Sequence, residues 1–173
     1  MDTKAGPNWP AYSYVPGGPW PHPVASPAGH SYGRVWPPTR PIDPDRWRES
    51  AEYAEGIALF NAGYYWEAHE VWERLWNAEG RRGAVAELLK ALIKLAAAGV
   101  KAREGRVGGV VTHLTRAASG LRAVEVEAGP RLLGLELGRL RRWVEELASH
   151  PPLCEAPREA AVVRVFAEPL RPE

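Results

Sequence analysis

The spacing of apolar positions predicts a series of short helices from residue 43 onward. Asp43-Pro44-Asp45 combines an N-cap residue, a proline at the first helical position and an early acid, which is typical of a helix start. This helix is expected to run to about Ala62, with Gly63 as its C-terminal stop. Further helices are expected over residues 65–78, 84–104, 108–127 and 130–148, the last one ended by Pro151-Pro152.

The stops at Gly63 and Gly105 divide the central helices into two similar hairpins. In the first hairpin, Gly56, Ala68 and Trp72 have the spacing of a tetratricopeptide unit, in which a small residue and an aromatic side chain let paired helices approach closely. The second hairpin matches this pattern weakly, and the distance between the stops differs from the usual repeat. The prediction is therefore an all-α bundle of about five antiparallel helices built from two tetratricopeptide-like hairpins, with no long solenoid.

Residues 1–42 have a different composition and are expected to form an extended arm. They hold ten of the 17 prolines and only four charged side chains, which excludes a regular helix or a central strand. The segment is also too aromatic for ordinary disorder, although a flexible tail remains the alternative. We expect a turn over residues 15–18, and rings that pack on the helical body, namely Trp9, Tyr12, Tyr14, Trp20, Tyr32 and Trp36.

The division is therefore an arm over residues 1–42, a helical domain over 43–150 and an irregular tail over 151–173, with a short extended segment at 162–166.

Polar residues gather on one edge of the helix predicted over residues 65–78. On a helical wheel, His69, Glu70 and Glu73 lie together beside the apolar face. His69 and Glu73 are one turn apart, so that imidazole and carboxylate can touch. Because another helix must complete a site, His113, nearly equivalent in the second hairpin, is the natural partner.

This edge has two interpretations. The first is functional: a site for a divalent transition metal, with His69, Glu73 and His113 as ligands and Glu70 as a ligand or general base, or an acid–base pair formed by the same residues. The second is a structural network in which His69 satisfies its own polar atoms. The arm offers two further contributors, His22 and His30, for which loop hydrogen bonds are the plainer expectation. The segment lacks the second histidine of the H-E-x-x-H motif of zinc proteases.

Composition narrows the classes of partner and compartment. The chain has 22 basic and 21 acidic residues, which argues against nucleic acid and against an anionic membrane as partners. The longest apolar run, residues 91–100, contains Lys94 and is too short to span a bilayer. A single cysteine, Cys154, and a start without a secretory signal predict a cytoplasmic protein. Abundant Ala, Arg and Gly, with hardly any Asn or Gln, suggest a thermophile or a GC-rich genome.

The stretch from Leu59 to Trp76, above all its His69-Glu70 pair and terminal tryptophan, resembles the signature of a prokaryotic family catalogued as domain of unknown function number 309. Residues 92–98, 103–105 and 109–117 also resemble this family, and segments 12–17 and 29–33 resemble arms that some longer members carry. Together the resemblance covers about residues 10–125. Lys94 stands where the family is expected to have Gln. The resemblance implies an all-α fold, draws attention to His69 and Glu70, and implies no particular reaction.

Two functions follow as hypotheses, and the sequence leaves open whether the protein is an enzyme. The first is a non-catalytic helical module that binds a protein or peptide, including a second copy of itself, because eight tryptophans exceed what one small core needs. The alternative is a metal-dependent hydrolase or metal-binding protein with its site between the second and fourth predicted helices.

Overall fold

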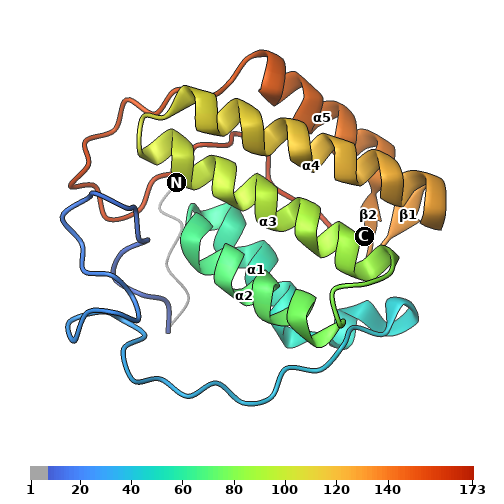
Figure 1. Ribbon diagram of the computed structural model, residues 1–173, viewed down its shortest axis with the longest axis horizontal. Helices are drawn as coiled ribbons and strands as arrows, with labels where there is room; N and C mark the ends of the chain where they lie inside the picture. Colours follow the sequence, from blue (N-terminus) through green and yellow to red (C-terminus); the bar gives the residue numbers. More distant parts are fainter. Residues whose placement is uncertain (1–7) are drawn as a thin grey trace.

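The computed structural model describes residues 8–173, and this part of the chain is mostly helical, which confirms the all-α class (Figure 1). The first seven residues of the predicted arm lie outside the described residues. The helical elements are the 3-10 helix η1 (Pro44–Glu49) and the α-helices α1 (Ala51–Ala62), α2 (Tyr65–Ala78), α3 (Ala84–Arg103), α4 (Val107–Ala128) and α5 (Leu137–Ser149). Two short strands, β1 (Arg131–Leu132) and β2 (Leu135–Glu136), pair in antiparallel register. No described helix has an apolar stretch long enough to cross a bilayer.

Consecutive α-helices pack against one another, so α1 with α2 and α3 with α4 form the two expected hairpins (Figure 1). Gly63 closes the first hairpin with φ 95°, and Gly105 closes the second with φ 72°. Only glycine adopts such a backbone readily, which explains why each helix stops there. The span of α2 agrees with the prediction to the residue.

The first hairpin is tight because a glycine faces an aromatic ring across it. A Cβ on Gly56 of α1 would overlap the indole of Trp72, which is fully buried on α2. The same device joins the hairpins, since a Cβ on Gly99 of α3 would lie 2.5 Å from the ring of Tyr65. The predicted contact between Gly56 and Trp72 is therefore confirmed.

The prediction of one continuous helix from residue 43 to about Ala62 is wrong. Residues 44–49 form the 3-10 helix η1, and α1 begins only after Ser50. The hydroxyl of Ser50 accepts a hydrogen bond from the Tyr53 backbone N–H at 3.2 Å and caps α1 at a new start. The cap at Asp43 is present as expected, since its Oδ1 accepts the Asp45 N–H at 3.0 Å.

The start of the last predicted helix is also wrong. Residues 131–136 form the β1–β2 hairpin, and α5 begins at Leu137. The turn between the strands places Leu133 at φ 47° and Gly134 at φ 76°, the positive pair that a two-residue hairpin turn requires. Leu133 accepts this unfavourable backbone because its side chain is buried and its carbonyl accepts the Tyr53 hydroxyl at 3.0 Å.

The arm packs on the helical body through its aromatic rings. Trp9 contacts Tyr64 edge-on with centroids 5.4 Å apart, and Tyr14 contacts Trp66 at 4.8 Å. The turn over residues 15–18 forms as predicted, with the Gly18 N–H donating to the Val15 carbonyl at 3.0 Å. Tyr32 differs from expectation, because it is 55% exposed.

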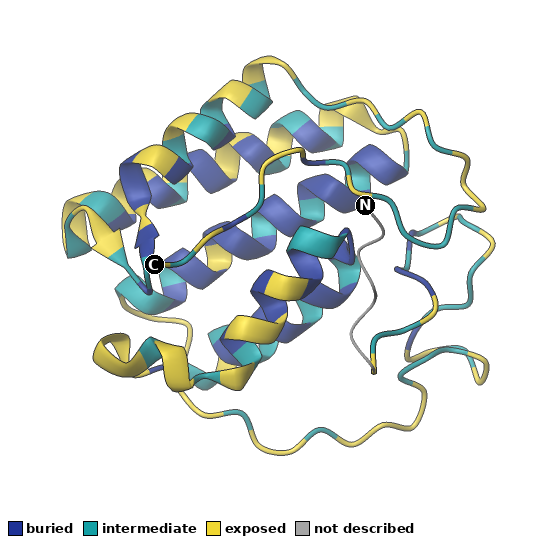
Figure 2. Ribbon diagram, turned by 180° about the vertical axis from the view of Figure 1, so that it is seen from behind, coloured by how far each residue is buried: buried dark blue, intermediate teal, exposed yellow. Residues whose placement is uncertain are grey.

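The segment after α5 has no helix or strand and crosses the helices (Figure 2). Most of its residues are partly buried or exposed, and Phe166 and Leu170 are the two that are buried. Residues 162–166 form no strand within the described chain. Their backbone is instead held by α2, because Tyr65 Oη accepts the N–H groups of Val165 at 2.7 Å and Phe166 at 3.1 Å. Arm and tail also meet, since the Ser13 N–H donates to the Ala161 carbonyl at 2.8 Å. Helix α2 therefore contacts both the arm and the tail.

Candidate functional site

One edge of α2 carries a compact group of potential ligands. His69, Glu70 and Glu73 each offer a ligand atom, and these atoms lie within 4.8 Å of one another. All three side chains are partly buried, between the covered face of α2 and solvent. The opposite side of the helix packs into the core through Ala68, Val71, Trp72 and Leu75. The helix therefore holds the three polar groups in a fixed row.

The imidazole of His69 is closest to the adjacent acid. Its Nδ1 lies 3.6 Å from Glu70 Oε1, beyond a direct hydrogen bond, and this buried nitrogen has no hydrogen-bond partner among the described residues. The nearby imidazole lowers the pKa of the Glu70 carboxyl, although partial burial opposes the shift. The expected pairing with Glu73 is not formed, since neither a hydrogen bond nor an ion pair joins His69 to Glu73 in residues 8–173.

His113 reaches the same region from α4 but stands outside the group that lies within 4.8 Å. Its Nδ1 is buried and without a hydrogen-bond partner in the described chain. Burial lowers the pKa of His113, and the positive charges of Lys94 and Lys101 lower it further, with smaller effects from Arg116 and His69. The imidazole is therefore neutral near pH 7.

The arm contacts a further carboxylate, that of Glu67, on the neighbouring turn of α2. Glu67 is only 7% exposed and accepts three hydrogen bonds from the arm. Ser13 Oγ donates to Oε2 at 2.7 Å, the Tyr14 N–H donates to Oε1 at 3.0 Å, and His30 Nε2 lies 3.0 Å from Oε1. This buried carboxylate therefore joins three arm residues to α2.

The two arm histidines have different roles. His30 folds over α2, whereas loop hydrogen bonds were the plainer expectation, and it contacts Glu67 and not the His69 group. His22 caps its own loop, because its Nδ1 accepts the N–H groups of Val24 at 3.3 Å and Ala25 at 3.2 Å. Its ring also lies edge-on to Trp66, with centroids 5.7 Å apart.

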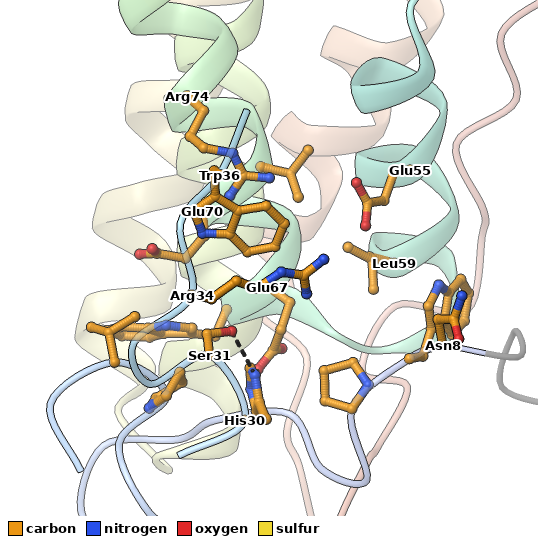
Figure 3. Close-up of a pocket in the computed structure, with 16 residues that line it drawn as sticks. Asn8, His30, Ser31, Arg34, Trp36, Glu55, Leu59, Glu67, Glu70 and Arg74 are labelled. Carbon is orange, nitrogen blue, oxygen red and sulfur yellow. Dashed lines mark hydrogen bonds and ion pairs between the residues drawn. The ribbon is translucent and has the colours of Figure 1, made fainter. Parts of the chain in front are cut away.

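A pocket of about 70 Å³ lies between the arm and helices α1 and α2 (Figure 3). His30, Glu67 and Glu70 line it, so that it adjoins the His69 group through Glu70. Trp36 supports one wall, with the guanidinium carbons of Arg34 at 3.8 Å and Arg74 at 4.0 Å from its ring centroid. Burial lowers the pKa of Arg74, an effect that the carboxylates of Glu55 and Glu70 oppose.

Glu67 is the site residue that sequence reasoning missed. It lies on the polar side of α2, where a carboxylate ordinarily faces solvent, and its burial comes from the arm more than thirty residues away in sequence. The sequence did offer one signal for the burial of Glu67: His30, in the Gly29-His30-Ser31 segment of the arm, was already a candidate contributor to the site on α2.

Fold and site thus define an all-α protein of helical hairpins, with a His/Glu group on α2 and an arm that encloses a pocket beside it. Residues 53–113 match the model of the family described as Domain of unknown function (DUF309). The match confirms the resemblance drawn from the α2 motif, and the matched segment includes His69, Glu70, Glu73 and His113. Neither curated proteins nor solved structures gave a match to the chain.

Proposed function

We propose that the protein binds a divalent transition metal at the α2 edge, with His69, Glu70 and Glu73 as protein ligands. The observation that carries this proposal is the convergence of one imidazole and two carboxylates, with ligand atoms within 4.8 Å. Ligands on a common tetrahedral ion lie roughly 3.4 Å apart, given metal–ligand bonds of about 2.1 Å. Small side-chain rotations on a rigid helix are enough to reach that spacing.

The imidazole suits zinc or iron, and the two carboxylates also suit manganese. Carboxylates bind metals when ionised, and the lowered pKa of Glu70 keeps it ionised near neutral pH. His69 Nδ1 has no hydrogen-bond partner among the described residues, so metal binding would satisfy a buried nitrogen that is otherwise unpaired.

His113 is the natural fourth group. An imidazole ligand must be neutral, and burial together with Lys94 and Lys101 keeps His113 in that form. Its buried Nδ1 is also unpaired within residues 8–173. Joining the site requires a shift of α4 or of the side chain, because His113 stands outside the compact group.

The competing hypothesis, a module that binds a protein or peptide, has less support. It rested on a surplus of exposed aromatic rings, yet none of the eight tryptophans, all within the described chain, is exposed. The large hydrophobic residues that are exposed among residues 8–173 are not tryptophans: they are Val24, Tyr32 and Val35 in the arm, Val107 and Val126 in α4, and Leu153 in the tail.

Metal titration of tag-free protein tests the proposal. After treatment with a chelator, isothermal titration with zinc, manganese and ferrous iron is expected to show one bound equivalent of at least one metal, together with a rise in Tm. His69→Ala and Glu73→Gln are expected to abolish this binding, because each removes one ligand.

Matched controls are available on exposed surface. His150→Ala and Glu127→Gln remove one exposed imidazole and one exposed carboxylate far along the chain from α2, and both are expected to leave binding unchanged. Wild-type protein that takes up well under one equivalent of every metal tested, with no change in Tm, would contradict the proposal.

A further inference from the structure

Ser31, His30 and Glu67 line the pocket between the arm and helices α1 and α2, and their side chains form a continuous line of hydrogen bonds. Ser31 Oγ lies 2.9 Å from His30 Nδ1, and His30 Nε2 lies 3.0 Å from Glu67 Oε1. Figure 3 shows Ser31, His30 and Glu67 together on the pocket wall. A hydroxyl, an imidazole and a carboxylate in this order are the elements of a base-activated nucleophile.

The carboxylate determines which nitrogen of His30 carries the proton. An ionised carboxylate has no proton to donate, so His30 Nε2 must be the donor in its contact with Glu67. In the neutral ring, Nδ1 then holds the free lone pair, and the Ser31 hydroxyl donates to it. The proton of Ser31 therefore points at a base, and the two nitrogens have exchanged the roles that they have in the common serine hydrolase arrangement.

The surroundings hold the line in place. Glu67 is oriented by two further donors, the Ser13 hydroxyl on Oε2 and the Tyr14 N–H on Oε1. The backbone of Ser31 is fixed in turn, because its N–H donates to the Pro23 carbonyl at 3.0 Å. The His30 side chain is only 13% exposed, so its hydrogen bond to Glu67 is largely shielded from water.

The pocket limits the substrate that can reach Ser31. Its volume of about 70 Å³ accommodates a small acyl group and no bulky one. Arg34 and Arg74 line the same pocket, and neither forms an ion pair among the described residues. Three carboxylates, those of Glu55, Glu67 and Glu70, line the pocket as well, so the two guanidinium groups offset negative charge there.

We propose that Ser31 is a nucleophile activated by His30 and that the pocket takes small carboxylic esters. Ser31 Oγ forms a bond to the carbonyl carbon while its proton passes to His30 Nδ1. The same proton then leaves with the alcohol when the ester C–O bond breaks. Water hydrolyses the acyl-serine by the reverse route, which restores both groups. Glu67 is a positioning residue, because it acts through His30.

The test uses methanesulfonyl fluoride, a reagent small enough for the pocket, on the full chain. Oγ bonds to sulfur, fluoride leaves and the serine proton goes to His30. Peptide mapping is expected to place the sulfonyl group on Ser31. His30→Gln is expected to slow the labelling about a hundredfold, since general-base help contributes roughly 10²–10⁴-fold. Adding EDTA is expected to change nothing, which separates this site from the proposed metal centre.

Ester turnover gives a second measurement. Hydrolysis of p-nitrophenyl acetate is expected to fall to background in Ser31→Ala, a variant that retains the His30–Glu67 contact. Ser26→Ala is the control, because Ser26 lies in the same loop and, within residues 8–173, its hydroxyl accepts only the Ala28 N–H, at 3.3 Å. Ser31 labelled no faster than Ser26, or turnover unchanged in Ser31→Ala, would overturn the proposal.

Discussion

Glu67 and His113 illustrate how single residues acquire chemistry from distant parts of the chain. Glu67 is a polar-edge carboxylate of α2 that becomes buried because Ser13, Tyr14 and His30 donate to it. His113, on α4, becomes a neutral imidazole because it is partly buried near the positive charges of Lys94 and Lys101 on α3. In both cases the residue type is visible in the sequence, while the property depends on neighbours that only folding supplies.

His113 predicts a specific pH dependence of stability. Its pKa lies below the ordinary value of 6.5 in the folded protein, because burial, Lys94 and Lys101 disfavour the charged form. The unfolded chain therefore binds more protons as pH falls through 6.5, and the free energy of unfolding should decrease. In metal-free protein, urea denaturation at successive pH values is expected to show this loss.

In the variant His113→Gln, the free energy of unfolding is expected to fall less steeply as pH decreases from neutral to below 6.5. His150→Gln is the control, because His150 is exposed at the end of α5. Equal slopes for wild type and His113→Gln would show that His113 is not protected from protonation by the fold.

At the scale of elements, helix pairing depends on where small residues face rings. Gly56 and Trp72 bring α1 and α2 together, and Gly99 with Tyr65 does the same for α3 and α2. Helix α2 presents its rings to both neighbours, which leaves only its polar edge for the His69 group. The close packing that fixes the fold also fixes the site.

Gly56→Ala is expected to destabilise the protein by about 1–3 kcal/mol, because the added methyl group overlaps the buried indole of Trp72. The comparison is Gly120→Ala in the middle of α4, where the new Cβ would lie 3.6 Å from Ala91 Cβ, an ordinary contact. That variant should be neutral or more stable by up to about 1 kcal/mol, since alanine favours helix. Urea denaturation measures both, and a Gly56→Ala protein as stable as Gly120→Ala would refute the packing argument.

Element boundaries were predictable where a local signal dominates. Gly63 and Gly105 stop helices through their own backbone preference, and the sequence located both. The β1–β2 hairpin escaped prediction because Leu133 at positive φ violates the local preference, and only its burial and the Tyr53 hydroxyl stabilise that conformation. Ser50 was similarly inconspicuous within a segment of continuous helical pattern.

At the scale of the molecule, the tail packs into the core beside α2 through Phe166. Phe166 is 4% exposed, stacks on Phe60 at 5.4 Å and meets Tyr65 and Trp143 edge-on. The tail therefore completes the aromatic core.

Phe166→Ala is expected to cost about 3–5 kcal/mol, because it removes a buried ring and leaves a cavity between the tail and the first hairpin. Leu153→Ala, in the same tail but 72% exposed, should change stability by at most about 0.5 kcal/mol. Thermal or urea denaturation distinguishes them, and similar stabilities for the two variants would mean that the tail does not contribute to the core.

By itself, the sequence determined the helical class, the two hairpins, the buried face of α2 and the placing of His69, Glu70 and Glu73 on one edge. These features follow from local backbone preference and from the 3.6-residue period, which any segment carries within itself. Tertiary structure alone decided that the arm covers Glu67, that His30 and Ser31 meet there, and that His113 stays apart from the α2 group. Such contacts join residues far apart in the chain, and the position of each depends on how every intervening element packs.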